Sequence, residues 1–184
     1  MIKLYKTKNS RLHYSECWID GKIATIHTGI VGNKGESEEI RDVKDENGFL
    51  ANFQKVWMKK GYALIPEEQQ SLLVLQWPMK TLTGSTYNHS IRNHAEALLN
   101  EHLGWLGLGH VDGFDMGRTS NPKEEFALNI FCKVVDDKIA VESIVKMLPL
   151  QLDCSRLKIA TRRIGDENFT LQYSAKEKEK TFYL

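Results

Sequence analysis

The hydrophobic pattern of the first third of the chain predicts strands followed by one helix. The runs "HYSECWI" (13–19) and "KIATIHT" (22–28) flank an Asp-Gly pair, which is typical of a tight hairpin turn. A third strand is predicted over "ESEEIRDV" (36–43). The apolar positions then change to helical spacing, at Phe49, Phe53, Val56 and Trp57. This pattern predicts a small antiparallel sheet with one helix on one of its faces.

The polar stretch "IPEEQQS" (65–71) has no periodicity and contains a proline, so it is the predicted boundary between two domains. Beyond it, helices are predicted over 88–106 and from Asp136 or Asp137 to Pro149. Strands are predicted over 72–77, 110–117, 126–135, 156–164 and 168–174. The order β-α-β-β-α-β is that of the ferredoxin-like fold. The predicted class is therefore α+β, with a sheet-plus-helix domain in residues 1–65 and a ferredoxin-like domain in residues 72–184.

Each domain is expected to bury a core of its own. The predicted core of the first consists of Trp18, Ile26, Phe49, Phe53 and Trp57. That of the second consists of Leu73, Leu75, Leu98, Leu128, Ile130, Ile144, Leu148 and Ile159. The charged segment "KEKEK" (176–180) is predicted to be a solvated edge, and the apolar residues after it could dock against the domain: Phe182, Tyr183 and Leu184.

The charge balance excludes a protein-wide footprint for nucleic acid. The chain has 25 Lys and Arg against 24 Asp and Glu, and neither residues 1–70 nor residues 71–184 carry a marked excess of one sign. No apolar run approaches the roughly 18–20 residues that span a bilayer, and the first residues do not resemble a signal peptide. We therefore expect a cytoplasmic protein that does not bind membranes. The three cysteines, Cys17, Cys132 and Cys154, are expected to be buried, reduced thiols.

Three features of the first 65 residues carry a resemblance to a known family: a glycine-rich strand end, a gap to an amphipathic helix, and the end of that helix. The segment "HTGIVGNKGE" (27–36) ends a predicted strand, and after a gap the amphipathic helix ends in "KKGY" (59–62). This part resembles the WGR domain, a module of poly(ADP-ribose) polymerases and of many bacterial proteins. The resemblance implies a small sheet with one helix, and nucleic-acid binding in the polymerases. Aligned on Gly29, however, Thr28 stands where the family has its tryptophan and Ile30 where it has its arginine.

That departure separates the fold from the function. In the polymerases the tryptophan stacks on nucleic acid and the arginine pairs with it, and neither threonine nor isoleucine can do this. The resemblance therefore implies the fold more strongly than the activity. The glycines at 29, 32 and 35 have two explanations: unusual backbone dihedrals in a turn, or a backbone that another group approaches closely.

One segment has the composition of a metal site. In "GHVDGFDMG" (109–117), His110, Asp112 and Asp115 could hold a divalent cation. The alternative, which we favour, is a turn or bulge at Asp112-Gly113 with His110 near a strand end. The sequence contains no nucleophile elbow, HExxH pair, P-loop or dinucleotide fingerprint. We therefore assign no catalytic residue and no cofactor.

A local basic patch could still bind nucleic acid. It would consist of the turn lysine and the helix lysines with one stacking ring: Lys34, Lys55, Lys59, Lys60 and Tyr62. Nearby Glu36, Glu38 and Glu39 favour the alternative, an ordinary solvated surface. The preferred hypothesis is a non-enzymatic, two-domain interaction protein of bacterial type, an adaptor or immunity protein that binds a protein partner. It rests on the balanced charge, the missing catalytic motifs and a spare aromatic, Trp105; nucleic-acid binding through the first domain is the alternative.

Overall fold

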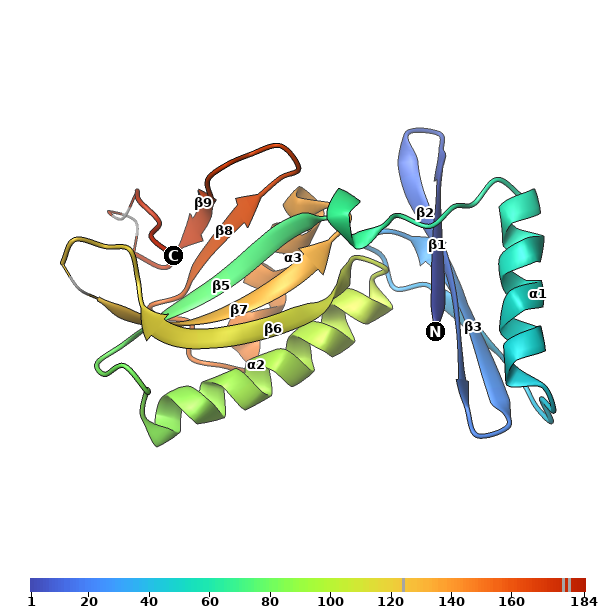
Figure 1. The fold of residues 1–184 in the computed structure, drawn as a ribbon, viewed down its shortest axis with the longest axis horizontal. Coiled ribbons are helices and arrows are strands. Elements are labelled where there is room, and N and C mark those ends of the chain that lie inside the picture. The colour runs from blue at the N-terminus through green and yellow to red at the C-terminus, as the bar shows by residue number, and fades with distance from the viewer. Residues whose placement is uncertain (124, 177, 179) are drawn as a thin grey trace. The chain divides into compact units, whose positions relative to one another are not determined.

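The computed structural model describes residues 1–123, 125–176, 178 and 180–184. Over these residues the chain forms two antiparallel sheets, of four and five strands, and three α-helices, which confirms the α+β class (Figure 1). It divides into two units. Unit 1 contains Met1–Pro66 and also Trp105–Gly107, whereas unit 2 contains Glu67–Gly104 and Leu108–Leu184. The chain thus changes unit inside the predicted boundary, but it also returns to unit 1 at Trp105–Gly107, which the predicted boundary had placed in the second domain.

Unit 1 is a four-stranded meander with one helix. Its strands are β1 (Ile2–Lys8), β2 (Arg11–Asp20), β3 (Ile23–Ile30) and β4 (Glu36–Ile40), and they lie in that order across the sheet. The helix α1 (Glu46–Lys59) follows. The predicted hairpin turn is present, and Gly21 has the positive φ of +57° that such a turn requires. The strand β1 was missed, because three lysines interrupt its apolar alternation.

The core of unit 1 lies between one face of the sheet and α1. It contains Leu4, Cys17, Ala24, Val43 and Phe53, and Ile26, Phe49 and Trp57 pack against it. The prediction that Trp18 belongs to this core is wrong. Trp18 is next to Cys17 on β2, and successive side chains of a strand point to opposite faces. Trp18 therefore lies on the face of the sheet turned away from α1.

Unit 2 has the ferredoxin-like topology with one additional strand. Its helices are α2 (Thr86–Trp105, with Trp105 assigned to unit 1) and α3 (Asp137–Met147), which cover one face of the sheet (Figure 1). The strands are β5 (Ser71–Met79), β6 (Gly109–Arg118), β7 (Phe126–Val134), β8 (Lys158–Arg162) and β9 (Thr170–Ser174). They are arranged β6-β7-β5-β8-β9, and every neighbouring pair is antiparallel. The first four have the ferredoxin-like order, to which β9 adds an edge.

The core of unit 2 is the one predicted, except at one position. The fully buried residues include Leu73, Leu75, Leu128, Ile130, Ile144, Leu148 and Ile159. Leu98 is only partly buried, while the next residue of α2, Leu99, is fully buried. The predicted buried thiols are also present, since Cys17, Cys132 and Cys154 are all buried and unbridged. In the described part of the chain, no helix combines the length and the apolar character that crossing a membrane requires.

A row of amides crosses the other face of this sheet. Asn129 donates to Asp115 Oδ1 at 2.7 Å, and Gln76 donates through Nε2 to Asn129 Oδ1 and to the carbonyl oxygen of Tyr183, each at 2.9 Å. The backbone N–H of Ser120 donates to Leu184 O at 2.7 Å. The apolar residues at 182–184 therefore dock as anticipated. Residues 177 and 179 of the charged segment before them lie outside the described residues.

Candidate functional site

A row of charged side chains crosses the sheet of unit 1 on the face turned away from α1. Lys3, Glu16 and His27 are cross-strand neighbours on β1, β2 and β3. Lys3 Nζ lies 2.7 Å from Glu16 Oε2, and His27 Nδ1 lies 2.7 Å from Glu16 Oε1. Glu16 is only 4% exposed, and a buried carboxylate is tolerated when it is paired. Each oxygen of Glu16 therefore has its own partner.

Tyr14 extends this network to a distant part of the chain. Its hydroxyl lies 3.0 Å from His27 Nε2 and 3.2 Å from the carbonyl oxygen of Trp105. Burial, together with the neighbouring Glu16 carboxylate, raises the pKa of Tyr14 to about 12. The phenol therefore keeps its proton and remains a donor at neutral pH. A second tyrosine holds the same segment, because Tyr5 donates to the carbonyl oxygen of Gly107 at 3.2 Å.

The structure answers why glycines recur between residues 29 and 35. A Cβ atom on Gly29 would lie 2.7 Å from the Tyr14 hydroxyl, and one on Gly35 would lie 2.2 Å from the carbonyl oxygen of Thr28. Gly32 instead has a φ of +88°, and its N–H donates to Leu106 O at 2.9 Å. Both explanations therefore hold, because Gly32 supplies the dihedral of the turn while Gly29 and Gly35 make room for the network.

Three rings pack above this network and form what we call the aromatic cluster: Trp18, His27 and Trp105. The Trp105 ring centroid lies 4.8 Å from that of His27 and 6.2 Å from that of Trp18, with steep interplanar angles of 71° and 88°. Edge-to-face contacts of this kind are favourable. Trp105 remains 37% exposed, and Lys34 Nζ lies 5.8 Å from its ring centroid. The cluster thus presents a fixed indole and an ammonium group to solvent.

The predicted nucleic-acid residues separate into two places. Lys60 Nζ lies 4.2 Å from the Trp57 ring, and Trp57 contacts Tyr62 edge to face at 4.9 Å. Lys6, on β1, adds its ammonium group 5.9 Å from the Tyr62 ring. We call Lys6, Trp57, Lys60 and Tyr62 the basic–aromatic cluster. Only the pairing of the sheet with α1 brings Lys6 to it, so sequence spacing could not have found this residue.

The other predicted lysines lie elsewhere. Lys55 and Lys59 are exposed on α1. Lys34 stands over Trp105, which packs on the face of the sheet turned away from α1. The structure therefore joins Lys60 and Tyr62 but places Lys34 on the opposite side of the same sheet.

The predicted metal residues all lie on β6. A bulge between Val111 and Gly113 interrupts the strand there. The Asp115 carboxylate accepts from Asn129, and His110 Nε2 lies 4.0 Å from Glu67 Oε1. Among the described residues, no three His, Cys, Asp or Glu side chains gather closely enough to hold a metal ion.

The charged network of unit 1 contains the residue types of a proton relay, but a substrate could not reach its central side chains. Tyr14 and His27 are both 0% exposed, so neither can touch a substrate. Their contacts instead hold Trp105 in place. The chemistry that this site offers is therefore recognition through the exposed Trp105 ring and Lys34.

Comparisons with protein-family models, with curated proteins and with solved structures gave no match to this chain.

Proposed function

We propose that the protein is a non-enzymatic, cytoplasmic interaction protein of bacterial type, with a WGR-like unit 1 that binds a protein partner through the aromatic cluster. An adaptor or an immunity protein would act in this way. The observation that carries the proposal is the state of Trp105, a residue that is 37% exposed while its carbonyl oxygen lies 3.2 Å from the hydroxyl of the buried Tyr14. Tryptophan is among the residues most enriched at the energetic centres of protein interfaces.

The surroundings of Trp105 favour a protein over a polyanion. A side chain that is already fixed loses little conformational entropy on binding, and Trp105 is packed against two other rings. Charges of both signs lie on this face of the sheet. Lys34 stands over the ring, while Glu39 pairs across the sheet with Thr25, the cross-strand neighbour of Trp18. An aromatic centre with polar groups at its rim is typical of the surface that another protein covers.

The proposal is tested by quantitative affinity capture from the native host. We expect a protein that the wild-type chain retains to be lost with Trp105→Ala and partly kept with Trp105→Phe. Leu150→Ala is the matched control, because Leu150 is 80% exposed and lies in unit 2. Thermal unfolding should show that all variants fold. No reproducible partner, or a partner retained equally by Trp105→Ala, would contradict the proposal.

Nucleic-acid binding through the basic–aromatic cluster is the second candidate. It is supported by the resemblance of unit 1 to the WGR domain and by the position of two ammonium groups beside partly buried aromatic rings. The ammonium group of Lys60 lies over the Trp57 ring, and that of Lys6 lies over the Tyr62 ring. Stacking rings with neighbouring cations suit single-stranded or open ends of nucleic acid.

A titration with a nicked duplex at two salt concentrations separates the two functions. Nucleic-acid binding predicts an affinity that falls steeply with salt and that Lys6→Ala with Lys60→Ala weakens, because each lost phosphate contact reduces counterion release. Lys34→Ala with Lys59→Ala tests the pair expected from sequence alone. Lys138→Ala, an exposed lysine of α3, is the control. A flat titration at low salt would remove this candidate.

A further inference from the structure

A cavity of about 310 Å³ opens at one end of the sheet of unit 2. It lies where β5 ends and where β7 and β8 begin, so three strands contribute to its wall. Pro78 and Met79 come from the end of β5, and Phe126 from the start of β7. Its volume is at the lower end of the range of small-molecule sites, which is about 300–1,000 Å³.

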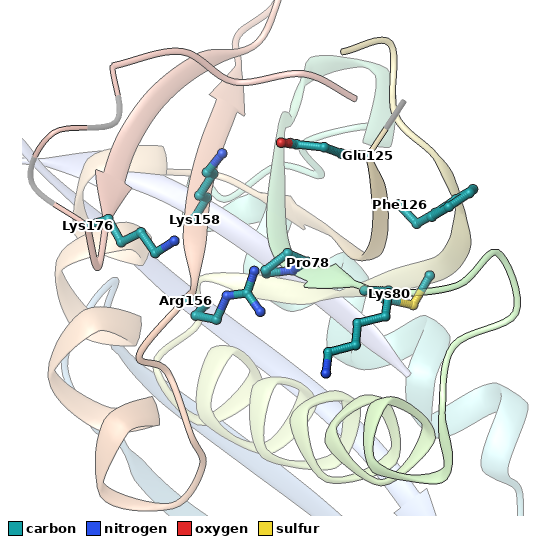
Figure 2. A pocket seen from close by; sticks show the side chains of 8 residues that line it. Pro78, Lys80, Glu125, Phe126, Arg156, Lys158 and Lys176 are labelled. Carbon is teal, nitrogen blue, oxygen red and sulfur yellow. The ribbon is translucent and has the colours of Figure 1, made fainter. Parts of the chain in front are cut away.

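Four cationic side chains line this cavity: Lys80, Arg156, Lys158 and Lys176. In the view of Figure 2, Arg156 lies between Lys176 and Lys80, and Glu125 lies above them, between Lys158 and Phe126. This gathering of positive charge is local, because residues 67–184 contain 14 basic and 16 acidic side chains. Lys80 and Arg156 come from the segments on either side of the strand ends, more than seventy residues apart in the chain.

Glu125 is the one carboxylate among the described lining residues, and it is already engaged. Its Oε2 atom accepts from Asn121 Nδ2 at 2.8 Å. The remaining wall is apolar, formed by Pro78, Met79 and Phe126. The cavity therefore combines cationic and apolar side chains, which together can recognise an anionic group attached to an apolar or planar body.

We propose that this cavity binds a phosphorylated small molecule. Its phosphate would be held by Arg156 and Lys80, and its apolar part would lie against Pro78, Met79 and Phe126. The planar guanidinium donates two parallel hydrogen bonds to a phosphate, and an ammonium group supplies a second charge at the same oxygen atoms. A nucleic-acid strand suits the site less well, because its next phosphates would meet the Glu125 carboxylate at the wall of the cavity.

The test is calorimetric titration of the full-length protein with inorganic phosphate, adenosine monophosphate and citrate at equal ionic strength. We expect saturable binding of the two phosphates, with adenosine monophosphate the tighter because it also covers the apolar wall. Arg156→Gln should weaken it about tenfold or more, since a charge-assisted bidentate contact is lost. Lys80→Gln should weaken it less, and Lys138→Gln on α3 should leave it unchanged within about twofold.

Three outcomes would overturn the proposal. The first is that neither phosphate shows saturable binding. The second is that citrate binds as tightly as adenosine monophosphate, which would mean a general anion site. The third is that Lys138→Gln weakens binding as much as Arg156→Gln, which would place the phosphate elsewhere. Thermal unfolding of each variant shows whether it is folded. If Arg156→Gln does not fold, Lys80→Gln, which replaces an exposed side chain, still tests the proposal.

Discussion

The Tyr14 hydroxyl lies 3.0 Å from His27 Nε2, and both side chains are 0% exposed. On its other side the imidazole bonds Glu16 through Nδ1 at 2.7 Å. If His27 donates its Nδ1 hydrogen to the carboxylate, Nε2 can accept from Tyr14, and the single phenolic hydrogen then serves either Nε2 or the carbonyl oxygen of Trp105, which lies 3.2 Å from the hydroxyl. This chain of contacts ends at the carbonyl oxygen of Trp105. The stability of unit 1 and the position of the exposed Trp105 ring therefore depend on the same buried groups.

The first prediction concerns alkaline pH. Burial raises the pKa of Tyr14 from 10.0 to about 12, so the unfolded chain ionises this phenol at a lower pH than the folded protein does. The stability that this difference contributes is complete below pH 10 and is lost as the pH rises from 10 to 12. Tyr14→Phe should therefore reduce the fall in the free energy of unfolding across this range, as measured by urea denaturation at several pH values. A Tyr14→Phe curve that runs parallel to the wild-type curve would contradict this account.

The second prediction concerns the carboxylate at the centre of the network. Glu16→Ala leaves Lys3 and His27 without their partner in a buried site, and we expect it to lower the free energy of unfolding by about 3 kcal/mol. Urea denaturation followed by tryptophan fluorescence measures this change. Glu39→Ala is the control, because Glu39 is exposed and its nearest cation, on Arg41, is 3.7 Å away. It should change the free energy of unfolding by no more than about 0.5 kcal/mol. A similar loss in both variants would contradict a particular role of the buried Glu16 pairs in stability.

The third prediction compares two glycines three residues apart. Gly107 has a φ of +64°, and a Cβ atom there would lie 2.2 Å from the Tyr14 ring. Gly104 is inside α2 with nothing within 4 Å of its added Cβ. Gly107→Ala should therefore destabilise the protein by about 2 kcal/mol or more and shift the tryptophan emission, since Trp105 must move. Gly104→Ala should instead stabilise it by up to about 0.5–1 kcal/mol, because Gly104 lies in the last turn of α2 and alanine has the higher helix propensity. Equal effects of the two substitutions would refute the close packing at Gly107.

The fourth prediction concerns acidic pH. Burial lowers the pKa of His102 below its usual 6.5, and its Nε2 atom is buried without a hydrogen-bond partner among the described residues. Below pH 6.5 the unfolded chain takes up a proton that the folded protein resists, so stability is complete above this pH and falls as the pH drops through the folded pKa. His102→Leu should flatten this acidic fall, as measured by thermal unfolding between pH 7 and pH 5. His89→Gln, an exposed residue of the same helix, is the control, and an unchanged acidic slope in His102→Leu would assign the effect to other groups.

The elements and their order could be predicted because they depend on local patterns. The Asp-Gly turn between β2 and β3, the helical spacing of Phe49 and Phe53, and the stop at Pro149 each act over a few residues. Element order then restricts the topology, since short connections and alternating strands and helices leave few arrangements of a sheet. The strand β1 was not predicted because three lysines interrupt its apolar pattern, although Leu4 and Tyr5 are buried.

The candidate sites could not be predicted in the same way, because they join residues that are far apart in the sequence. Trp105 was noted as a spare aromatic, but nothing in its local sequence assigns it to the network of Tyr14 and His27. Likewise Lys80 and Arg156 meet at one cavity only because β5 and β8 are neighbours in the sheet. Periodicity says which side of an element is buried, whereas strand pairing and register decide what lies opposite it. The sequence alone therefore determined the fold class and the order of the helices and strands after β1, and the tertiary structure alone decided which side chains meet.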